Sequence, residues 1–364
     1  MEKSKYIKHI SGLKGMACVF IMLFHYLEIY KTSVDFFPRI NFLDKLLNSS
    51  FGFLFNQTYW LYLFFIISGY LISKSSITSF KEFIVKSVSR FFRFFFPVFF
   101  ADFVIFLLVK IFSFSNYDTI TLFTCPFLQT YPYGTSLSFI NLLKSPVAVF
   151  FQNGNFFNPP FWVIKPMFIA SVVIYFFKFL LTKTFDKYEN FLIVVLTLVL
   201  CLLFKFNTAI AAVLLGMCLE VYGNNIKEYL SKPCFNICFL VLVMLMYIVK
   251  SEILGCLFFM ALVILIPMIP ALNKLFSSKF FLYLEKMSWG IYSFHMIIFC
   301  TIGCKILLLS VKSMNLLLAF ICASIASVLI TVILSQIYFI SFEKAASFIN
   351  AKISGFMKKH FLKK

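Results

Sequence analysis

Long apolar runs alternate with short polar segments along almost the whole chain. A transmembrane helix needs roughly 20 mainly apolar residues. Ten runs approach this length: 12–30, 52–73, 94–113, 160–177, 190–204, 207–222, 234–249, 253–272, 287–309 and 314–342. The pattern therefore predicts an all-α integral membrane protein with about ten transmembrane helices.

The composition points to the same class of protein. Hydrophobic residues make up 62% of the 364 residues and charged residues 13%, whereas soluble domains are about half apolar and about a quarter charged. A single water-soluble core cannot hold this much apolar surface. We therefore expect the lipid bilayer as a partner and no nucleic acid, and we interpret the net charge of +19 as a topology signal.

The positive charges are unevenly distributed between alternate loops. If the N-terminus is cytoplasmic, 22 Lys and Arg residues fall in inner segments and nine in outer ones. Because cytoplasmic loops are enriched in Lys and Arg, both termini are predicted to be cytoplasmic. We expect a single transmembrane domain over 1–343 and a basic cytoplasmic tail over 344–364, lying on the anionic inner leaflet.

The longest segment between predicted spans is 114–159, which this topology places on the outer side. It is rich in proline and aromatic residues and carries only Asp118 and Lys144 as charges. Long loops of this kind are usually functional or disordered, and this one is too aromatic for disorder. Two interpretations stay open: a lid over an outward-facing site, or an inert loop packed on the outer leaflet.

Lys14 and His25 are the most informative ionisable residues inside a predicted span, where such residues are rare. They are eleven residues apart, almost three helical turns, so both lie on one helix face about 16 Å apart. Lys14 at the inner end is suited to an anionic cosubstrate, and an imidazole deeper in the membrane can take a proton. The alternative is structural: Lys14 reaches the inner surface and His25 bonds within the bundle.

Seven short motifs occur in order along the chain. They are Ser11-Gly12-Leu13-Lys14-Gly15-Met16 followed by Leu23-Phe24-His25, then Phe64 to Ile72 with Ser68-Gly69 at its centre, Arg90-Phe91-Phe92-Arg93 with Pro97, Asn158-Pro159-Pro160-Phe161-Trp162, Leu215-Gly216-Met217, Ser288-Trp289-Gly290-Ile291-Tyr292-Ser293-Phe294-His295, and Phe342-Glu343-Lys344. Together they resemble the family-3 membrane-bound acyltransferases, which are bacterial O-acyltransferases of surface polysaccharides. The chain departs from the family pattern at Lys14, where Arg is usual, and at Met167, where an acidic residue is usual.

The resemblance implies an enzyme of the bacterial inner membrane. It would move an acyl group, expected to be acetyl, from cytoplasmic acyl-CoA to a hydroxyl of a cell-surface polysaccharide or its lipid-linked precursor. His25 is then the expected base, and Lys14, Lys86, Arg90 and Arg93 are the expected contacts of the donor's phosphates, because a basic mouth attracts and binds phosphate. Acyl-CoA, expected to be acetyl-CoA, would be a cosubstrate and not a permanently bound cofactor.

Further pathway candidates follow from their position in or beside the spans. His295 is predicted to join His25 as a catalytic residue or to bond a neighbouring helix, and Asp102, Trp162, Lys165 and Tyr292 are candidates for the pathway or for structural contacts. The ten cysteines lie mostly in apolar runs and behave there as small hydrophobic residues, so no metal site is expected. The rival function is a transporter or flippase for a glycan or small anion. Such carriers often show repeated halves with broken helices, and the sequence shows no repeat.

Overall fold

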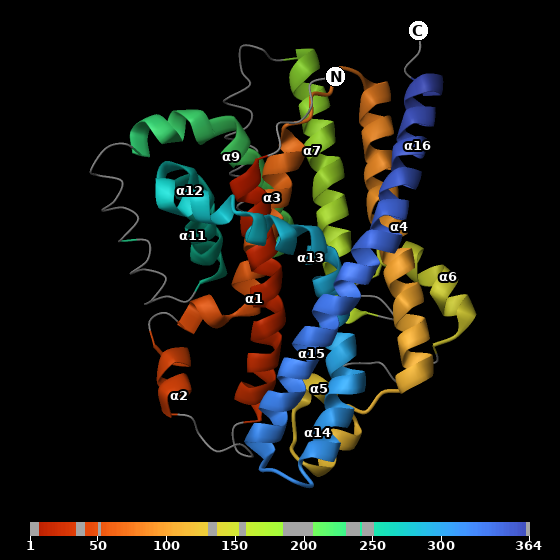
Figure 1. Ribbon diagram of the computed structural model, residues 1–364. Coiled ribbons are helices and arrows are strands. Elements are labelled where there is room, and N and C mark those ends of the chain that lie inside the picture. Colours follow the sequence, from red (N-terminus) through yellow and green to blue (C-terminus); the bar gives the residue numbers. More distant parts are fainter. Residues whose placement is uncertain are drawn as a thin grey trace.

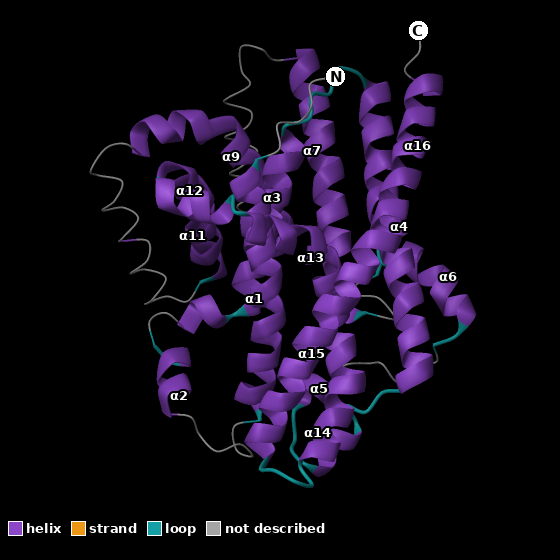
Figure 2. Ribbon diagram, viewed as in Figure 1, coloured by secondary structure: helices purple, strands orange, loops and turns teal. Residues whose placement is uncertain are grey.

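Every regular element in the described part of the chain is a helix (Figure 2). The computed structural model describes residues 7–33, 41–49, 52–129, 137–152, 158–184, 207–230, 241 and 251–361. Apolar segments in a bilayer must satisfy their backbone hydrogen bonds internally, and a helix does so within one segment. The all-α prediction is thus confirmed for these residues.

The helices have the following bounds: α1 (Lys8–Thr32), α2 (Asn41–Leu47), η1 (Gly52–Phe55), α3 (Gln57–Ser73), α4 (Phe80–Phe112), η2 (Asp118–Thr121), α5 (Pro126–Gln129), α6 (Phe139–Ala148), η3 (Pro159–Val163), α7 (Ile164–Thr184), α9 (Thr208–Leu230), α11 (Glu252–Leu265), η5 (Ile266–Met268), α12 (Pro270–Phe276), α13 (Lys279–Ile298), η6 (Phe299–Gly303), α14 (Cys304–Ser310), α15 (Leu316–Tyr338), η7 (Phe339–Glu343) and α16 (Lys344–Phe361). The elements η6 and η7 are π-helical turns, and the others marked η are 3₁₀ turns.

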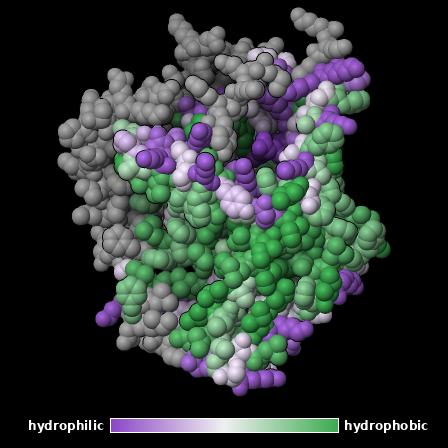
Figure 3. All heavy atoms as spheres, in the orientation of Figure 1, coloured by the Kyte–Doolittle hydropathy of each residue, from purple (hydrophilic) through white to green (hydrophobic). Residues whose placement is uncertain are grey.

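Five helical stretches within the described residues are long and apolar enough to cross a membrane: Lys8–Thr32, Phe80–Phe112, Pro159–Leu180, Lys279–Ser310 and Leu316–Phe361. A sixth arises if the bent pair α11–α12 is one span. The predicted span 190–204, and all of 234–249 but residue 241, lie outside the described residues, so ten spans remain a prediction. Figure 3 shows a hydrophobic band over the middle of one face, with hydrophilic residues towards both ends.

The start of α4 differs from the prediction. The segment 74–93 was expected as an inner loop before a span at 94–113, but the helix begins at Phe80. The Ser79 side chain accepts a hydrogen bond from the backbone N–H of Glu82 and caps the helix, and Ser-x-x-Glu is a known helix-start pattern. Lys86, Arg90 and Arg93 therefore lie on one face of a rigid helix.

The predicted span 253–272 is also interrupted. Its two parts, Glu252–Met268 and Pro270–Phe276, meet at an angle of 100°. Pro267 and Pro270 lie at the break, and proline cannot donate the backbone hydrogen bond that a continuing helix needs. The segment is consequently bent instead of straight.

The segment 114–152 forms short helices where the structure describes it. The Ser115 N–H donates to the Cys300 carbonyl at 2.9 Å, and the Thr32 hydroxyl lies 3.3 Å from the Cys125 sulfur. These contacts fasten η2 and α5 to the ends of α1 and α13–α14. The segment α6 packs on α4. Whether this segment acts as a lid or as an inert cover stays open.

Close helix pairs position the rest of the bundle (Figure 1). The most extensive contacts join α1 to α13, α3 to α9, α13 to α15, α1 to α3, and α16 to α4. A Cβ atom at Gly69 would overlap the Val213 carbonyl oxygen, so α3 and α9 touch backbone to backbone at this small residue. Helix α1 begins and α16 ends at the same end of the bundle (Figure 1), while the cytoplasmic orientation of that end remains a prediction.

Candidate functional site

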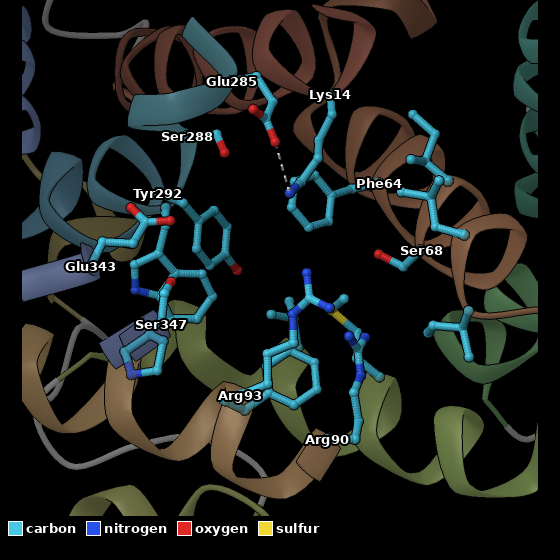
Figure 4. Close-up of a pocket in the computed structure, with 18 of the residues that line it drawn as sticks. Lys14, Phe64, Ser68, Arg90, Arg93, Glu285, Ser288, Tyr292, Glu343 and Ser347 are labelled. Atoms are coloured by element: carbon cyan, nitrogen blue, oxygen red, sulfur yellow. Dashed lines mark ion pairs between the residues drawn. The ribbon is translucent and has the colours of Figure 1, made fainter. Parts of the chain in front are cut away.

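A cavity of about 360 Å³ opens between α1, α3, α4, α7, α13 and the junction of α15 with α16 (Figure 4). Its ionisable lining consists of four cations and two carboxylates: Lys14, Arg90, Arg93, Lys286, Glu285 and Glu343. The apolar lining includes Phe64, Phe94 and Met167. The cavity thus has a net positive lining, which is suited to an anionic ligand with an apolar portion.

Lys14 lies on one wall of this cavity and is paired with a carboxylate. Its ammonium group is 3.8 Å from Glu285 Oε1 and lies 5.1 Å from the centre of the Phe64 ring. Both ion-pair partners are about one quarter exposed, at 29% and 25%, so the pair is accessible to a competing anion. Sequence reasoning missed Glu285 and its neighbour Lys286, although they stand three and two residues before the Ser288 motif.

Arg90 and Arg93 approach the cavity from the opposite wall (Figure 4). Arg90 is buried, and its Nε donates to the Ser171 hydroxyl at 3.1 Å while its guanidinium carbon lies 4.4 Å from the Phe94 ring centre. These contacts fix the plane of the guanidinium and use only one of its N–H donors. Arg93 is exposed. The pair therefore consists of one buried and one exposed guanidinium group, and two neighbouring guanidinium groups can bind a diphosphate through charge-assisted hydrogen bonds.

Lys86 is placed one helical turn before Arg90 but outside the cavity lining. Its ammonium group donates to the Ser76 carbonyl at 2.7 Å. Lys86 is therefore at the rim of the basic region and not within it.

A second polar centre is formed by two histidines. The rings of His25 and His295 stack with 5.0 Å between their centres and 18° between their planes. His295 is fully buried, and its Nδ1 lies 3.0 Å from the Ile291 carbonyl oxygen. Because a carbonyl oxygen only accepts, Nδ1 carries the proton and Nε2 keeps a lone pair in the neutral ring. Nε2 has no hydrogen-bond partner among the described residues.

Tyr292 connects the two centres. Its side chain lines the cavity, and its ring centre is 6.2 Å from that of His295. The hydroxyl donates to the Pro160 carbonyl at 2.5 Å, which fixes the ring in place. The cavity therefore ends one aromatic ring away from the histidine pair, while Lys14 and His25 of the same helix contribute to different centres.

The other three pathway candidates do not line the cavity. Asp102 is fully buried on α4, Trp162 is 41% exposed with its ring 6.2 Å from Phe65, and Lys165 donates to the Phe151 carbonyl at 2.9 Å. Of these four pathway candidates, only Tyr292 lines the cavity.

Two π-helical turns adjoin the site, and no sequence pattern predicted them. The turn η7 places Phe339 and Glu343 in the cavity wall, and η6 begins four residues after His295. Such turns occur frequently at functional sites because they redirect side chains within a helix.

A comparison with known protein families identifies the family of this chain. The acyltransferase domain of family 3 matches residues 7–336, which covers most of the chain. The chain belongs to the family-3 acyltransferases. The predicted family is thereby confirmed, and six of the seven motifs lie within the matched residues.

Membership in the family-3 acyltransferases supports an acyltransferase activity, and the apolar helices agree with a multi-pass membrane protein. The cavity and the histidine pair lie within the matched residues except for Phe339, Glu343 and Ser347, which follow them. Neither the curated proteins nor the solved structures contain a match to the chain.

Proposed function

We propose that this family-3 acyltransferase moves an acetyl group from cytoplasmic acetyl-CoA to a hydroxyl of a cell-surface polysaccharide or its lipid-linked precursor. One observation carries the proposal: a basic cavity ends at Tyr292, one ring away from a stacked histidine pair. The first centre has the charge that a nucleotide donor requires. The second has the groups that acyl transfer to an oxygen requires.

The donor is assigned to the basic cavity on grounds of charge and length. Arg90 and Arg93 would bind the pyrophosphate through charge-assisted hydrogen bonds, and Lys14 would leave Glu285 to contact the donor. The helical rise from Lys14 to His25 is about 16 Å. An extended pantetheine arm bridges a distance of this order, so its thioester would reach the histidine pair past Tyr292.

The transfer step is a nucleophilic attack by an oxygen. His25 takes the proton of the acceptor hydroxyl, the oxygen attacks the thioester carbonyl, and the C–S bond breaks as the CoA sulfur leaves. The proton held by the imidazole passes to that sulfur, which restores the neutral ring. His295 stacks on His25 and presents its unprotonated Nε2 as a second base that the acceptor hydroxyl could approach.

The family usually has a carboxylate at the position of Met167, and the proposed reaction does not need one there. Met167 is buried in the cavity wall, and its carbonyl accepts a hydrogen bond from Ser171 at 2.5 Å. It therefore supports the serine that holds Arg90. The acidic groups of the cavity come instead from Glu285 and Glu343.

A matched pair of histidine variants tests the proposal. His25→Ala should abolish transfer of labelled acetyl from acetyl-CoA to surface glycan, with the protein still present in the bacterial inner membrane. His360→Ala is the control, because His360 is exposed on α16 and its Nδ1 bonds only the Phe356 carbonyl at 2.9 Å. Unchanged acetylation in His25→Ala, measured by mass spectrometry of the glycan, would refute the proposed role.

The rival function, a transporter or flippase for a glycan or small anion, has one observation in its favour. The 100° break between α11 and α12 is a broken helix of the kind that lines transport pathways. Reconstituted vesicles separate the two functions. Movement of intact glycan without consumption of acetyl-CoA would support transport, whereas release of CoA only in the presence of acceptor would support the transferase.

A further inference from the structure

Helix α16 follows the residues matched by the family and completes one side of the cavity. Ser347 lines the cavity, and the Ser354 hydroxyl donates to the Ser89 hydroxyl of α4 at 2.9 Å. Ser347, Ser354 and Lys358 are spaced seven and four residues apart, so all three lie on one face of the helix. That face is turned towards α4.

The facing side of α4 carries its own row of cations. Lys86, Arg90 and Arg93 are spaced four and three residues apart and share one face. The two helices run in opposite directions (Figure 1). Lys358 lies one turn after Ser354, and Lys86 lies about one turn before Ser89. Because the helices are antiparallel, the two lysines lie at the same level, further out from the cavity.

Several charges surround Lys86 at this level. The positive charges of Lys358 and Lys178 repel its ammonium group, and the negative charge of Glu82 attracts it. The Glu82 carboxylate is already engaged, because it accepts hydrogen bonds from the Thr78 N–H at 2.8 Å and the Thr78 hydroxyl at 3.0 Å. Cations held near one another repel unless an anion lies between them.

We propose that Lys358 and Lys86 bind a phosphomonoester of the donor at the mouth of the cavity, namely the 3′-phosphate of coenzyme A. This inference rests on the proposed function. Coenzyme A carries a pyrophosphate and one separate phosphate, and the structure offers two arginines of α4 inside the cavity and two lysines at its mouth. The inner pair, Arg90 and Arg93, takes the pyrophosphate, and the outer pair takes the remaining phosphate.

The same two lysines could meet the phosphate of an anionic lipid. The geometry favours the nucleotide, because the Lys358 face of α16 is continuous with Ser347 in the cavity wall. The opposite face of α16 carries the exposed Phe348 and Phe356, with Lys352 lying 4.6 Å from the Phe348 ring centre. That face is suited to the bilayer surface.

Binding of coenzyme A and of 3′-dephospho-coenzyme A to the full-length protein tests this assignment. Both affinities are measured by calorimetry in nanodiscs of zwitterionic lipid, and again in nanodiscs with anionic lipid. The variants are Lys358→Ala and Lys86→Ala. The control is Lys352→Ala, on the opposite face of α16.

The wild type and Lys352→Ala should bind coenzyme A about tenfold more tightly than its dephospho form, as expected for one charge-assisted contact. Each of the other two variants should reduce this ratio to about twofold or less by weakening coenzyme A binding alone. Equal affinities in the wild type, or an unchanged ratio in Lys358→Ala, would overturn the assignment. So would a ratio that appears only without anionic lipid, which would mean that lipid phosphate occupies the lysines.

This experiment also separates the two proposals. Binding needs no acceptor and no turnover. If the affinity ratio falls in the lysine variants as expected but no acetyl transfer is found, the transferase is refuted and the phosphate site is kept. Acetyl transfer that proceeds equally well with and without the 3′-phosphate on the donor would refute the phosphate site and keep the transferase.

Discussion

Replacing Gly290 by alanine tests how closely α13 must approach α15 to hold the site together. Gly290 follows Trp289 of the cavity wall and precedes Tyr292 and His295 on the same helix. A Cβ atom at this position would lie 2.8 Å from both the Cα and the Cβ of Ser335, whereas ordinary van der Waals contact begins at 3.4 Å. The two helices must therefore separate by about 0.6 Å, the difference between these distances.

The loss of folding free energy in Gly290→Ala can be estimated by comparison with a control variant. Inserting a methyl group into a packed contact costs about 1–3 kcal/mol, and a backbone shift of 0.6 Å places Gly290→Ala near 2 kcal/mol within that range. Alanine also favours helix formation over glycine by about 1 kcal/mol. Gly355→Ala on α16 gives the same gain without the clash, because nothing lies within 4 Å of its added Cβ.

The difference between the two variants isolates the steric cost. For a chain of 364 residues, 2 kcal/mol corresponds to an unfolding temperature about 3 °C lower in Gly290→Ala than in Gly355→Ala. Thermal unfolding in detergent measures this difference, and acetyl transfer should fall in Gly290→Ala alone, since Tyr292 and His295 move with α13. Equal unfolding temperatures would refute the close α13–α15 contact.

Three further predictions concern the two polar centres. Lys14→Met should raise the KM for acetyl-CoA about tenfold through loss of one charged contact, whereas Lys14→Arg should retain it; steady-state kinetics that show an unchanged KM in Lys14→Met would remove Lys14 from the donor site. Tyr292→Phe should lower the free energy of unfolding by about 1 kcal/mol, because the bond to the Pro160 carbonyl is lost, yet keep acetyl transfer; loss of transfer without loss of stability would give the hydroxyl a chemical role. His295→Phe should keep a ring stacked on His25 but lower kcat about 100-fold, the usual worth of a proton-transfer group; a wild-type kcat would exclude His295 from the reaction.

Local sequence patterns predicted the helices of the fold but were wrong at the start of α4 and at the break between α11 and α12. The apolar runs predicted helices because the bilayer demands internal hydrogen bonding wherever a segment is apolar. The start of α4 was missed because Lys86, Arg90 and Arg93 were assigned to a loop, although Ser79 and Glu82 carry a helix-start signal. The break between α11 and α12 was missed because its prolines fall inside an otherwise continuous apolar run.

The sequence by itself determined the class of the protein, the helical character of its segments, and the family motifs that carry Lys14, His25 and His295. Only the tertiary structure decided which of these residues meet. It stacked His25 on His295, which is 270 residues away, and it brought Glu285 and Glu343 into the cavity of Lys14. The reason is physical: helical periodicity fixes which residues share a face of one helix, whereas contacts between helices depend on how distant faces pack, and no local pattern encodes that register.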